Sequence, residues 1–383
     1  MAAAIAYGQS DRATAVRAAE LCRLGRYAES APLFVQAIEA ERKARQLDRR
    51  RLADLLNQLG IVNRRLGRYS EAETAYGESL ALSEQLPADG DVDRAGTLTN
   101  LAELKRLEGK LDDAEQLAGR ALSICRQRLE PDDIQIAETF NNLGAILAAK
   151  RELAAAVDLY ERALAICNRR PETNPAVTAA VLHNLGIAYF KLGRSAEAEG
   201  SLRNALEIRE SALGPDHPDT LATVANLAEF DLLQGRLRSA EALYLRSLTI
   251  AGKLRPDDPA DPARIAALEG LAIVYRRLGR LTESEGRYRL FIAGLEGGGK
   301  AAPARLAAAR EGLADVYAEK SRFDRAVALY ELAIAAWEQL SDSSRLPRLL
   351  SKYSAALRRL KRNAEARAAD QRASVILLSG SGR

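Results

Sequence analysis

A three-residue turn recurs along this chain at an almost constant interval. Its first copy is Gly25-Arg26-Tyr27, and the later copies begin at Gly67, Gly109, Arg151, Gly193, Gly235, Gly279, Ser321 and Lys361. The first five intervals are 42 residues each, and the last three are 44, 42 and 40 residues. A period of this length is typical of proteins in which similar units stack in one row and bind along an extended surface. The period therefore predicts nine units in a single array over all 383 residues, where length alone would suggest two or three domains.

Each unit has the pattern of two helices. In residues 220–252, apolar side chains recur at steps of three and four residues on both sides of Gly235. This spacing predicts two helices joined by a tight turn. The linker before them contains two prolines, which lack the backbone N–H that a helix interior needs, and Asp219 or Thr220 is the predicted N-cap. We therefore expect an all-α fold made of antiparallel helix hairpins.

Small residues occupy fixed places in the hairpins. Seven residues before the turns stand Ala18, Gly60, Ala102, Gly144, Gly186, Ala228, Ala272, Ala314 and Ser354. Five residues after the turns stand Ser30, Ala72, Ala114, Ala156, Ala198, Ala240, Ser284, Ala326 and Ala366. Helix axes can approach closely only where side chains are small, so the two helices of each hairpin are predicted to cross at these places. Large side chains are expected to fill the space beside the crossings, namely Phe34, Tyr76, Tyr160, Tyr244, Tyr288 and Tyr330.

The order of Leu185-Gly186, Tyr189, Gly193 and Ala198 resembles the tetratricopeptide repeat, whose units are usually 34 residues long. The eight additional residues, with segments 212–220 and 141–144, resemble the longer repeats of kinesin light chain and its bacterial relatives. The resemblance covers all nine units and implies a right-handed superhelical solenoid that acts as a protein-protein interaction adaptor. The predicted units are 11–45, 52–86, 94–129, 135–169, 176–212, 219–252, 262–296, 303–340 and 346–378. The sequence departs from the family pattern at Arg151 in the fourth turn, at glycines 297–299 and in the weak ninth unit.

An amide side chain recurs two positions before the small residue of the first helix. The members of this amide row are Gln58, Asn100, Asn142, Asn184 and Asn226. Asn is unfavourable in the middle of a helix, so its repetition needs an explanation. One interpretation is that each amide ties neighbouring hairpins together; the other is that the amides bind the N–H and C=O groups of an extended peptide. The resemblance implies the second, because in that family this position faces the concave groove, and it carries over loosely to Gln58.

Charged residues flank the amide row on the same helices. Arg64, Arg106, Lys191 and Arg276 are predicted to bind a peptide, since Arg and Lys can hold carboxylates. The guest would then be an acidic peptide or a free C-terminus, and the alternative is that these residues are solvated helix ends. His183, beside Asn184, is predicted either to hydrogen-bond the ligand or to be polar surface.

Other classes of function find little support in the sequence. The chain has 56 basic and 52 acidic residues, so the net charge of +4 does not indicate nucleic acid as a partner. No run of 18 apolar residues or basic leader is present, so we expect a cytoplasmic protein without membrane insertion. Two His and three Cys stand in different units, so neither a zinc set nor a Cys/His nucleophile is apparent, and Cys125 and Cys167 are predicted to be small buried side chains. Segment 294–301 resembles a phosphate-binding loop but has Ala301 where a hydroxyl is needed, so no cofactor and no enzymatic activity are predicted.

The ninth unit is basic. Residues 345–372 contain nine Lys or Arg and two Asp or Glu, which is typical of the polar outer face of a terminal repeat. The apolar tail 374–378 is expected to seal the last hairpin or to dock on a partner. The alternative function is therefore a structural scaffold, or a homo-oligomer that assembles through its outer face or its basic end.

Overall fold

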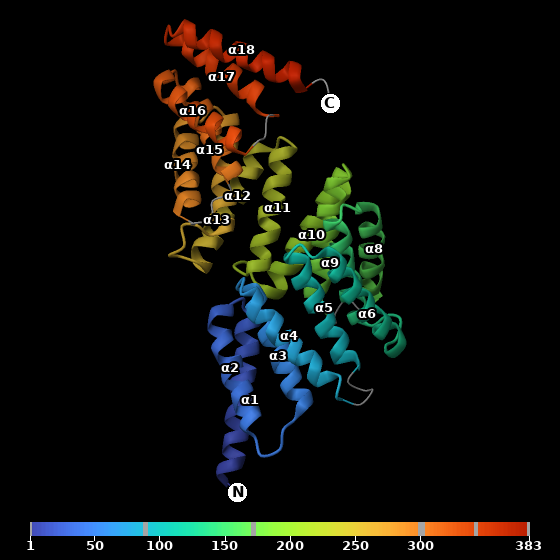
Figure 1. The fold of residues 1–383 in the computed structure, drawn as a ribbon. Coiled ribbons are helices and arrows are strands. Elements are labelled where there is room, and N and C mark those ends of the chain that lie inside the picture. Colours follow the sequence, from blue (N-terminus) through green and yellow to red (C-terminus); the bar gives the residue numbers. More distant parts are fainter. Residues whose placement is uncertain (1, 87–90, 170–173, 298–302, 341–343, 381–383) are drawn as a thin grey trace. The chain divides into compact units, whose positions relative to one another are not determined.

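A computed structural model describes residues 2–86, 91–169, 174–297, 303–340 and 344–380, and side chains between residues 12 and 378. The described residues form eighteen helices and no strand, and Figure 1 shows the helices in consecutive antiparallel pairs. The pairs are α1 (Ala2–Arg23) with α2 (Tyr27–Lys43), α3 (Arg49–Arg65) with α4 (Tyr69–Ser83), α5 (Asp91–Leu107) with α6 (Leu111–Arg128), α7 (Ile134–Ala149) with α8 (Leu153–Arg169), α9 (Pro175–Lys191) with α10 (Ser195–Leu213), α11 (Pro218–Leu233) with α12 (Leu237–Leu254), α13 (Pro262–Arg277) with α14 (Leu281–Gly297), α15 (Pro303–Glu319) with α16 (Phe323–Gln339), and α17 (Leu346–Arg359) with α18 (Asn363–Gly380). The predicted all-α hairpin fold is confirmed.

The recurring turn has a left-handed residue at its first position. Six of the nine turns have Gly there, with φ between 73° and 78°. Arg151, Ser321 and Lys361 adopt the same conformation, with φ of 69°, 57° and 63°. The fourth turn therefore keeps the backbone of the others although its residue carries a Cβ atom, which makes that conformation costly.

The small residues lie where the two helices of a hairpin cross. The Ser30 hydroxyl donates to the carbonyl of Ala18 at 2.7 Å, and the Ser284 hydroxyl donates to the carbonyl of Ala272 at 2.7 Å. All eighteen small residues at the two predicted places are buried, as are the six predicted aromatic side chains. The predicted crossing point is confirmed.

Two glycines show why the amide row ends after the sixth hairpin. Gly270 and Gly312 occupy the row position in α13 and α15. A Cβ atom there would lie 2.2 Å from the ring of Tyr244 and 2.5 Å from the ring of Tyr288, both from the preceding hairpin. These rings fill the space between consecutive hairpins, so an amide side chain at this position would have to displace them.

Contacts group the chain into two compact units, Met1–Thr220 (unit 1) and Leu221–Arg383 (unit 2). In unit 1, first helices of neighbouring hairpins contact one another, in the pairs α1/α3, α3/α5, α5/α7 and α7/α9. The described residues of neighbouring second helices make no comparable contact. The first helices are therefore the closer set, and they line the inner, concave face of unit 1. That one continuous array spans both units stays a prediction.

Unit 1 also closes on itself. A Cβ atom on Gly25, in the first turn, would lie 2.4 Å from Cδ of Pro218, which is far along the chain. Arg65 at the end of α3 donates to both carboxylate oxygens of Asp219, at 2.8 and 3.3 Å. The first residues of α11 therefore pack against the ends of the first two hairpins.

The predicted N-cap of α11 is wrong. The helix begins at Pro218, before both Asp219 and Thr220. Proline fits the first turn because an N–H there would have no partner within the helix. Nδ1 of His217 accepts a hydrogen bond from the backbone N–H of Asp219 at 3.1 Å, so a histidine in the linker performs part of the capping role.

Candidate functional site

The amide row of unit 1 lies on the inner face formed by α3, α5, α7 and α9. Nδ2 of Asn100 donates to Oδ1 of Asn57 at 3.0 Å, and Nδ2 of Asn184 donates to Oδ1 of Asn141 at 2.9 Å. Each bond joins the first helices of neighbouring hairpins. The interpretation that the amides tie hairpins together is therefore confirmed for these two residues, whose remaining amide atoms are not used by those bonds.

Asn142 lies between the two bridged pairs. Its side chain is half-buried and makes no hydrogen bond to the part of the chain that the structure describes. Gln58 bonds instead to Asp54 on its own helix, and Asn226, also half-buried, belongs to unit 2. A half-buried amide without a partner in the protein keeps its donor and acceptor open to solvent or to a ligand. Asn142 thus offers one donor group and one acceptor to a ligand on the inner face.

The predicted basic residues of unit 1 surround a carboxylate. Arg106 donates two hydrogen bonds to Glu103, at 2.7 and 2.8 Å, and Nη1 of Arg64 lies 3.8 Å from the same carboxylate. The hydrogen bonds to Glu103 raise the pKa of Arg106. Lys191, at the end of α9, is exposed. Glu103 therefore neutralises Arg106, whereas Arg64 has only the longer contact, and its buried Nε has no hydrogen-bond partner among the described residues.

The other side of the amide row is acidic. Asp54 and Glu138 precede Gln58 and Asn142 by four residues, which is about one helical turn. Part of the Asp54 side chain is exposed to solvent, but the surrounding protein partly desolvates its carboxyl and raises its pKa. Burial also raises the pKa of Glu138. Asp54 also lines a polar cavity of about 520 Å³ between the second and third hairpins, together with Asn57. Neither carboxylate was singled out from the sequence, although the four-residue offset from the row could have identified both.

His183 is buried, not exposed as either interpretation of it assumed. Only 9% of its surface is exposed, and burial together with the nearby Arg209 lowers the pKa of His183 to about 3. The imidazole is therefore neutral at physiological pH. Its place in the core indicates a packing role, and ligand binding by His183 stays a prediction.

In unit 2, ion pairs replace the amides between first helices. Arg276 of α13 contacts Asp315 at 2.8 Å and Glu319 at 2.7 Å, both on α15. Lys352, which holds the row position in α17, contacts Asp315 at 2.8 Å, and the Tyr330 hydroxyl donates to the same carboxylate at 2.7 Å. Because Arg276 is held by two carboxylates, its predicted part in peptide binding would require these pairs to open.

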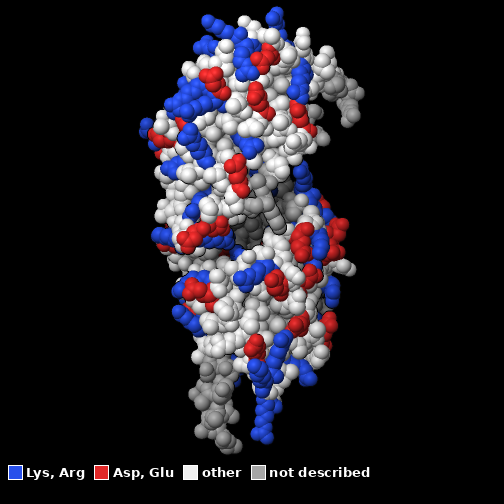
Figure 2. Space-filling view, turned by 60° about the vertical axis from the view of Figure 1, so that its left-hand side comes forward, with Lys and Arg blue, Asp and Glu red and all other residues white. Residues whose placement is uncertain are grey.

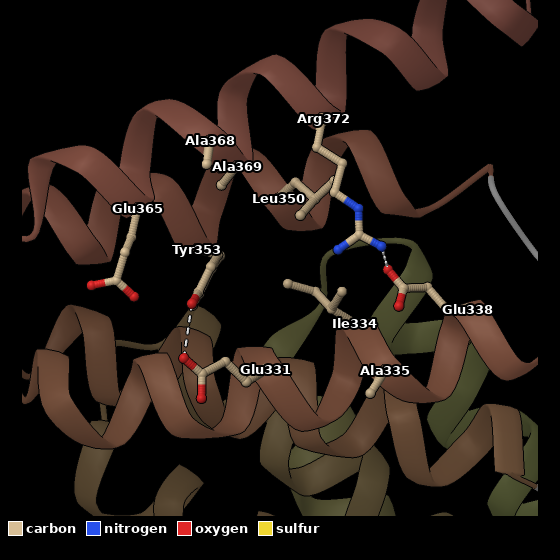
Figure 3. Close-up of a pocket in the computed structure, with 10 residues that line it drawn as sticks. All are labelled: Glu331, Ile334, Ala335, Glu338, Leu350, Tyr353, Glu365, Ala368, Ala369 and Arg372. Atoms are coloured by element: carbon tan, nitrogen blue, oxygen red, sulfur yellow. Dashed lines mark hydrogen bonds and ion pairs between the residues drawn. The ribbon is translucent and has the colours of Figure 1, made fainter.

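A second cavity, of about 410 Å³, lies between α16 and α18 (Figure 3). It is lined by Glu331, Ile334, Ala335, Glu338, Leu350, Tyr353, Glu365, Ala368, Ala369 and Arg372. Figure 3 shows the Tyr353 hydroxyl bonded to Glu331 at one end, and Arg372 paired with Glu338 at the other. Between these contacts the floor is apolar. Ala369 stands where the preceding second helix has Leu329, so the missing volume has a simple origin in the sequence.

Other features bear on which ligands the chain could take. Within the described ranges, no three side chains of metal-ligating type lie together, and none of the helices there is long and apolar enough to span a membrane. Cys125 and Cys167 are buried free thiols, as predicted. On the face drawn in Figure 2, basic and acidic side chains are interspersed. Segment 294–301, which resembles a phosphate-binding loop in sequence, extends past residue 297 and so lies partly outside the described residues.

Comparisons with known proteins agree with the repeat architecture. A family model described as tetratricopeptide repeat matches residues 11–85, 93–169 and 177–253, more than half of the chain. No curated protein matches significantly. Among solved structures, a signal transduction ATPase with a tetratricopeptide repeat sensor from Pyrococcus horikoshii is 12% identical, with a TM-score of 0.67 over 94% of this chain and 54% of that one.

Two further structures are similar over nearly their whole length. The apo form of the quorum sensor NprR from B. thuringiensis is 15% identical, with a TM-score of 0.57 over 96% of this chain and 99% of that one. A putative kinesin light chain from Podospora anserina with nearly identical repeats is 23% identical, with a TM-score of 0.45 over 53% of this chain and 95% of that one.

Proposed function

The chain belongs to the tetratricopeptide repeat family, and we propose that this protein is a non-catalytic adaptor that binds an extended segment of a partner protein on the inner face of unit 1. The observation that carries the proposal is Asn142, an unpaired, half-buried amide between two bridged amide pairs. An amide supplies one acceptor and two N–H donors, so it can bind backbone groups without regard to the side chains of the guest.

The bridged amides support the same surface. The side-chain amides of Asn100 and Asn184 each donate one N–H to the neighbouring hairpin, and this bond fixes the side chain. The Oδ1 atom of each residue is left to accept an N–H of a guest peptide. Side chains that are already held lose little further freedom when a ligand binds. Residues Gln58, Asn100, Asn142 and Asn184 are therefore the proposed contacts in unit 1, and Asn226 is the corresponding amide of unit 2.

The basic residues have a smaller part in the proposed site. An acidic guest would have to compete with Glu103 for Arg64 and Arg106. We therefore place these arginines at the border of the site, with Lys191 as the basic side chain that is open to a guest carboxylate.

A displayed library of random 14-residue peptides, selected on the full chain, tests the proposal. Selected peptides should lose at least about tenfold in affinity for Asn142→Ala, because a lost hydrogen bond of about 1.4 kcal/mol has that effect. Asn204→Ala on the exposed face of α10 is the matched control and should bind normally. Unchanged affinity for Asn142→Ala, with an unchanged helical circular dichroism spectrum, would contradict the proposal.

Self-assembly through the C-terminal end is the second candidate. It is favoured by Val375, Leu377 and Leu378, which are 61–76% exposed, whereas only Ile376 of this segment packs on the core. The predicted sealing of the last hairpin by the tail is therefore wrong for most of the segment. Light scattering of the full chain and of a Val375→Ser/Leu378→Ser variant would test it, because a dimer through this face should dissociate in the variant.

A further inference from the structure

Two carboxylates on the inner face of unit 1 have no basic partner. Asp54 and Glu138 form no ion pair with any residue that the structure describes. The neighbouring Asp93, by contrast, lies 3.1 Å from Nε of Arg50. Both unpaired carboxylates lie about one helical turn before a member of the amide row, so they lie on the same side of that row.

The charges across the inner face are unbalanced. On the far side of the row, Glu103 already neutralises Arg106 and lies near Arg64. On the near side, partial desolvation of the carboxylates without a cation is unfavourable, and this penalty would be relieved by a bound positive charge. A guest is therefore attracted most strongly through basic side chains that point to the near side.

The equivalent positions in the other two hairpins leave room for a guest. They are Gly96 in α5 and Ala180 in α9, so the near side alternates between an acidic and a small residue. Asp54 also borders the 520 Å³ cavity, whose two arginines are held by other carboxylates, Arg50 by Asp93 and Arg51 by Glu41. The two acidic residues thus lie two hairpins apart, in the second and the fourth hairpin.

This spacing has a consequence for an extended guest. Packed helices lie roughly 10 Å apart, so equivalent positions two hairpins apart are separated by roughly 20 Å. An extended chain advances about 3.3 Å per residue, so about six residues span that distance. Six is even, and alternate side chains of an extended chain point to the same side. Two residues six apart can therefore reach both carboxylates.

We infer that the bound segment of the partner carries two Lys or Arg side chains six residues apart, which pair with Asp54 and Glu138. This inference rests on the proposed function, because it requires the segment to lie extended along the amide row. It selects a basic guest over the acidic one that the arginines alone suggested.

The same peptide selection tests the inference through spacing. Among the selected 14-residue peptides, Lys or Arg pairs at a separation of six should be enriched over separations of five and seven. A fluorescein-labelled peptide with lysines six apart should lose about tenfold in affinity, measured by anisotropy, when one lysine is moved by one residue. It should lose at least as much on Asp54→Asn/Glu138→Gln, which keeps the size of both side chains. Glu207→Gln, on the exposed face of α10, is the matched charge control.

The possible failures can be told apart. Peptides that depend on Asn142 but show no preference for this spacing, or that bind Asp54→Asn/Glu138→Gln normally, would overturn the inference and leave the proposed function standing. If no selected peptide depends on Asn142, both the inference and the proposed function are wrong.

Discussion

Replacing Arg151 by glycine should stabilise the fourth hairpin. Arg151 has a φ of 69°, and its turn makes the same backbone bonds as the glycine turns. Its N–H donates to the carbonyl of Ala148 at 3.2 Å, and the next N–H donates to that of Leu147 at 2.9 Å. Gly67 makes the corresponding bond at 3.1 Å. The two turns thus differ in the Cβ atom and not in hydrogen bonding.

The magnitude follows from two opposing terms. A left-handed conformation costs a residue with a Cβ atom about 1–2 kcal/mol. Glycine avoids that cost but loses about 0.5–1 kcal/mol more conformational entropy on folding. The net gain for Arg151→Gly is therefore about 0.5–1 kcal/mol. Gly109→Ala in the preceding turn, where φ is 78°, should lose a similar amount.

Hydrogen exchange is the suitable assay, because repeat arrays open locally and a single unfolding free energy can miss one hairpin. The amides of residues 151 and 152 should exchange about two to five times more slowly in Arg151→Gly than in the wild type. Arg151→Ala, which keeps the Cβ atom, should give no such gain. Equal protection in the glycine and alanine variants would show that the left-handed conformation is not the cause, and the reasoning would fail.

Four further variants test packing and protonation. Ala369→Leu should raise the stability of the last hairpin in urea by about 1 kcal/mol, because it fills the cavity between α16 and α18, and a loss would contradict the packing described. Gly312→Ala should lower stability by about 1–3 kcal/mol, since its Cβ would lie 2.5 Å from Tyr288, whereas Gly77→Ala, with open space around it, should raise stability by up to about 1 kcal/mol. The low pKa of His183, about 3 when folded, means that its neutral form is favoured in the fold: its stabilisation is complete above pH 6.5 and is lost as pH falls towards 3. The free energy of unfolding of the wild type, measured by urea titration, should therefore be about 2 kcal/mol lower at pH 5 than above pH 6.5. His183→Gln should remove most of this pH dependence.

Most of the fold follows from the repeat. Turn glycines, small residues and aromatic residues recur at fixed places, and each place has one physical role in all hairpins. Ser30 and Ala18, for example, were assigned to the crossing from their offsets to the turn alone, and the structure joins them by a hydrogen bond. A periodic sequence supports such assignments because every unit repeats the evidence.

The site was less accessible to sequence analysis. The spacing of 42 residues identifies the amide row, but it does not identify the partners Asn57 and Asn141, which stand one residue before Gln58 and Asn142. The burial of His183 depends on the neighbouring hairpin, and periodicity within one unit does not report it. The pairing of Arg276 with Asp315 likewise depends on the rotation of one helix against the next.

The contact between Gly25 and Pro218 changes how unit 1 should unfold. In an ideal linear array each repeat touches only its neighbours, so stability is a sum of local terms and an end can fray without effect elsewhere. Here the first turn packs on the first residue of α11. Loss of the first hairpin would therefore also expose residues almost two hundred positions away, and unit 1 should melt as one cooperative body instead of repeat by repeat.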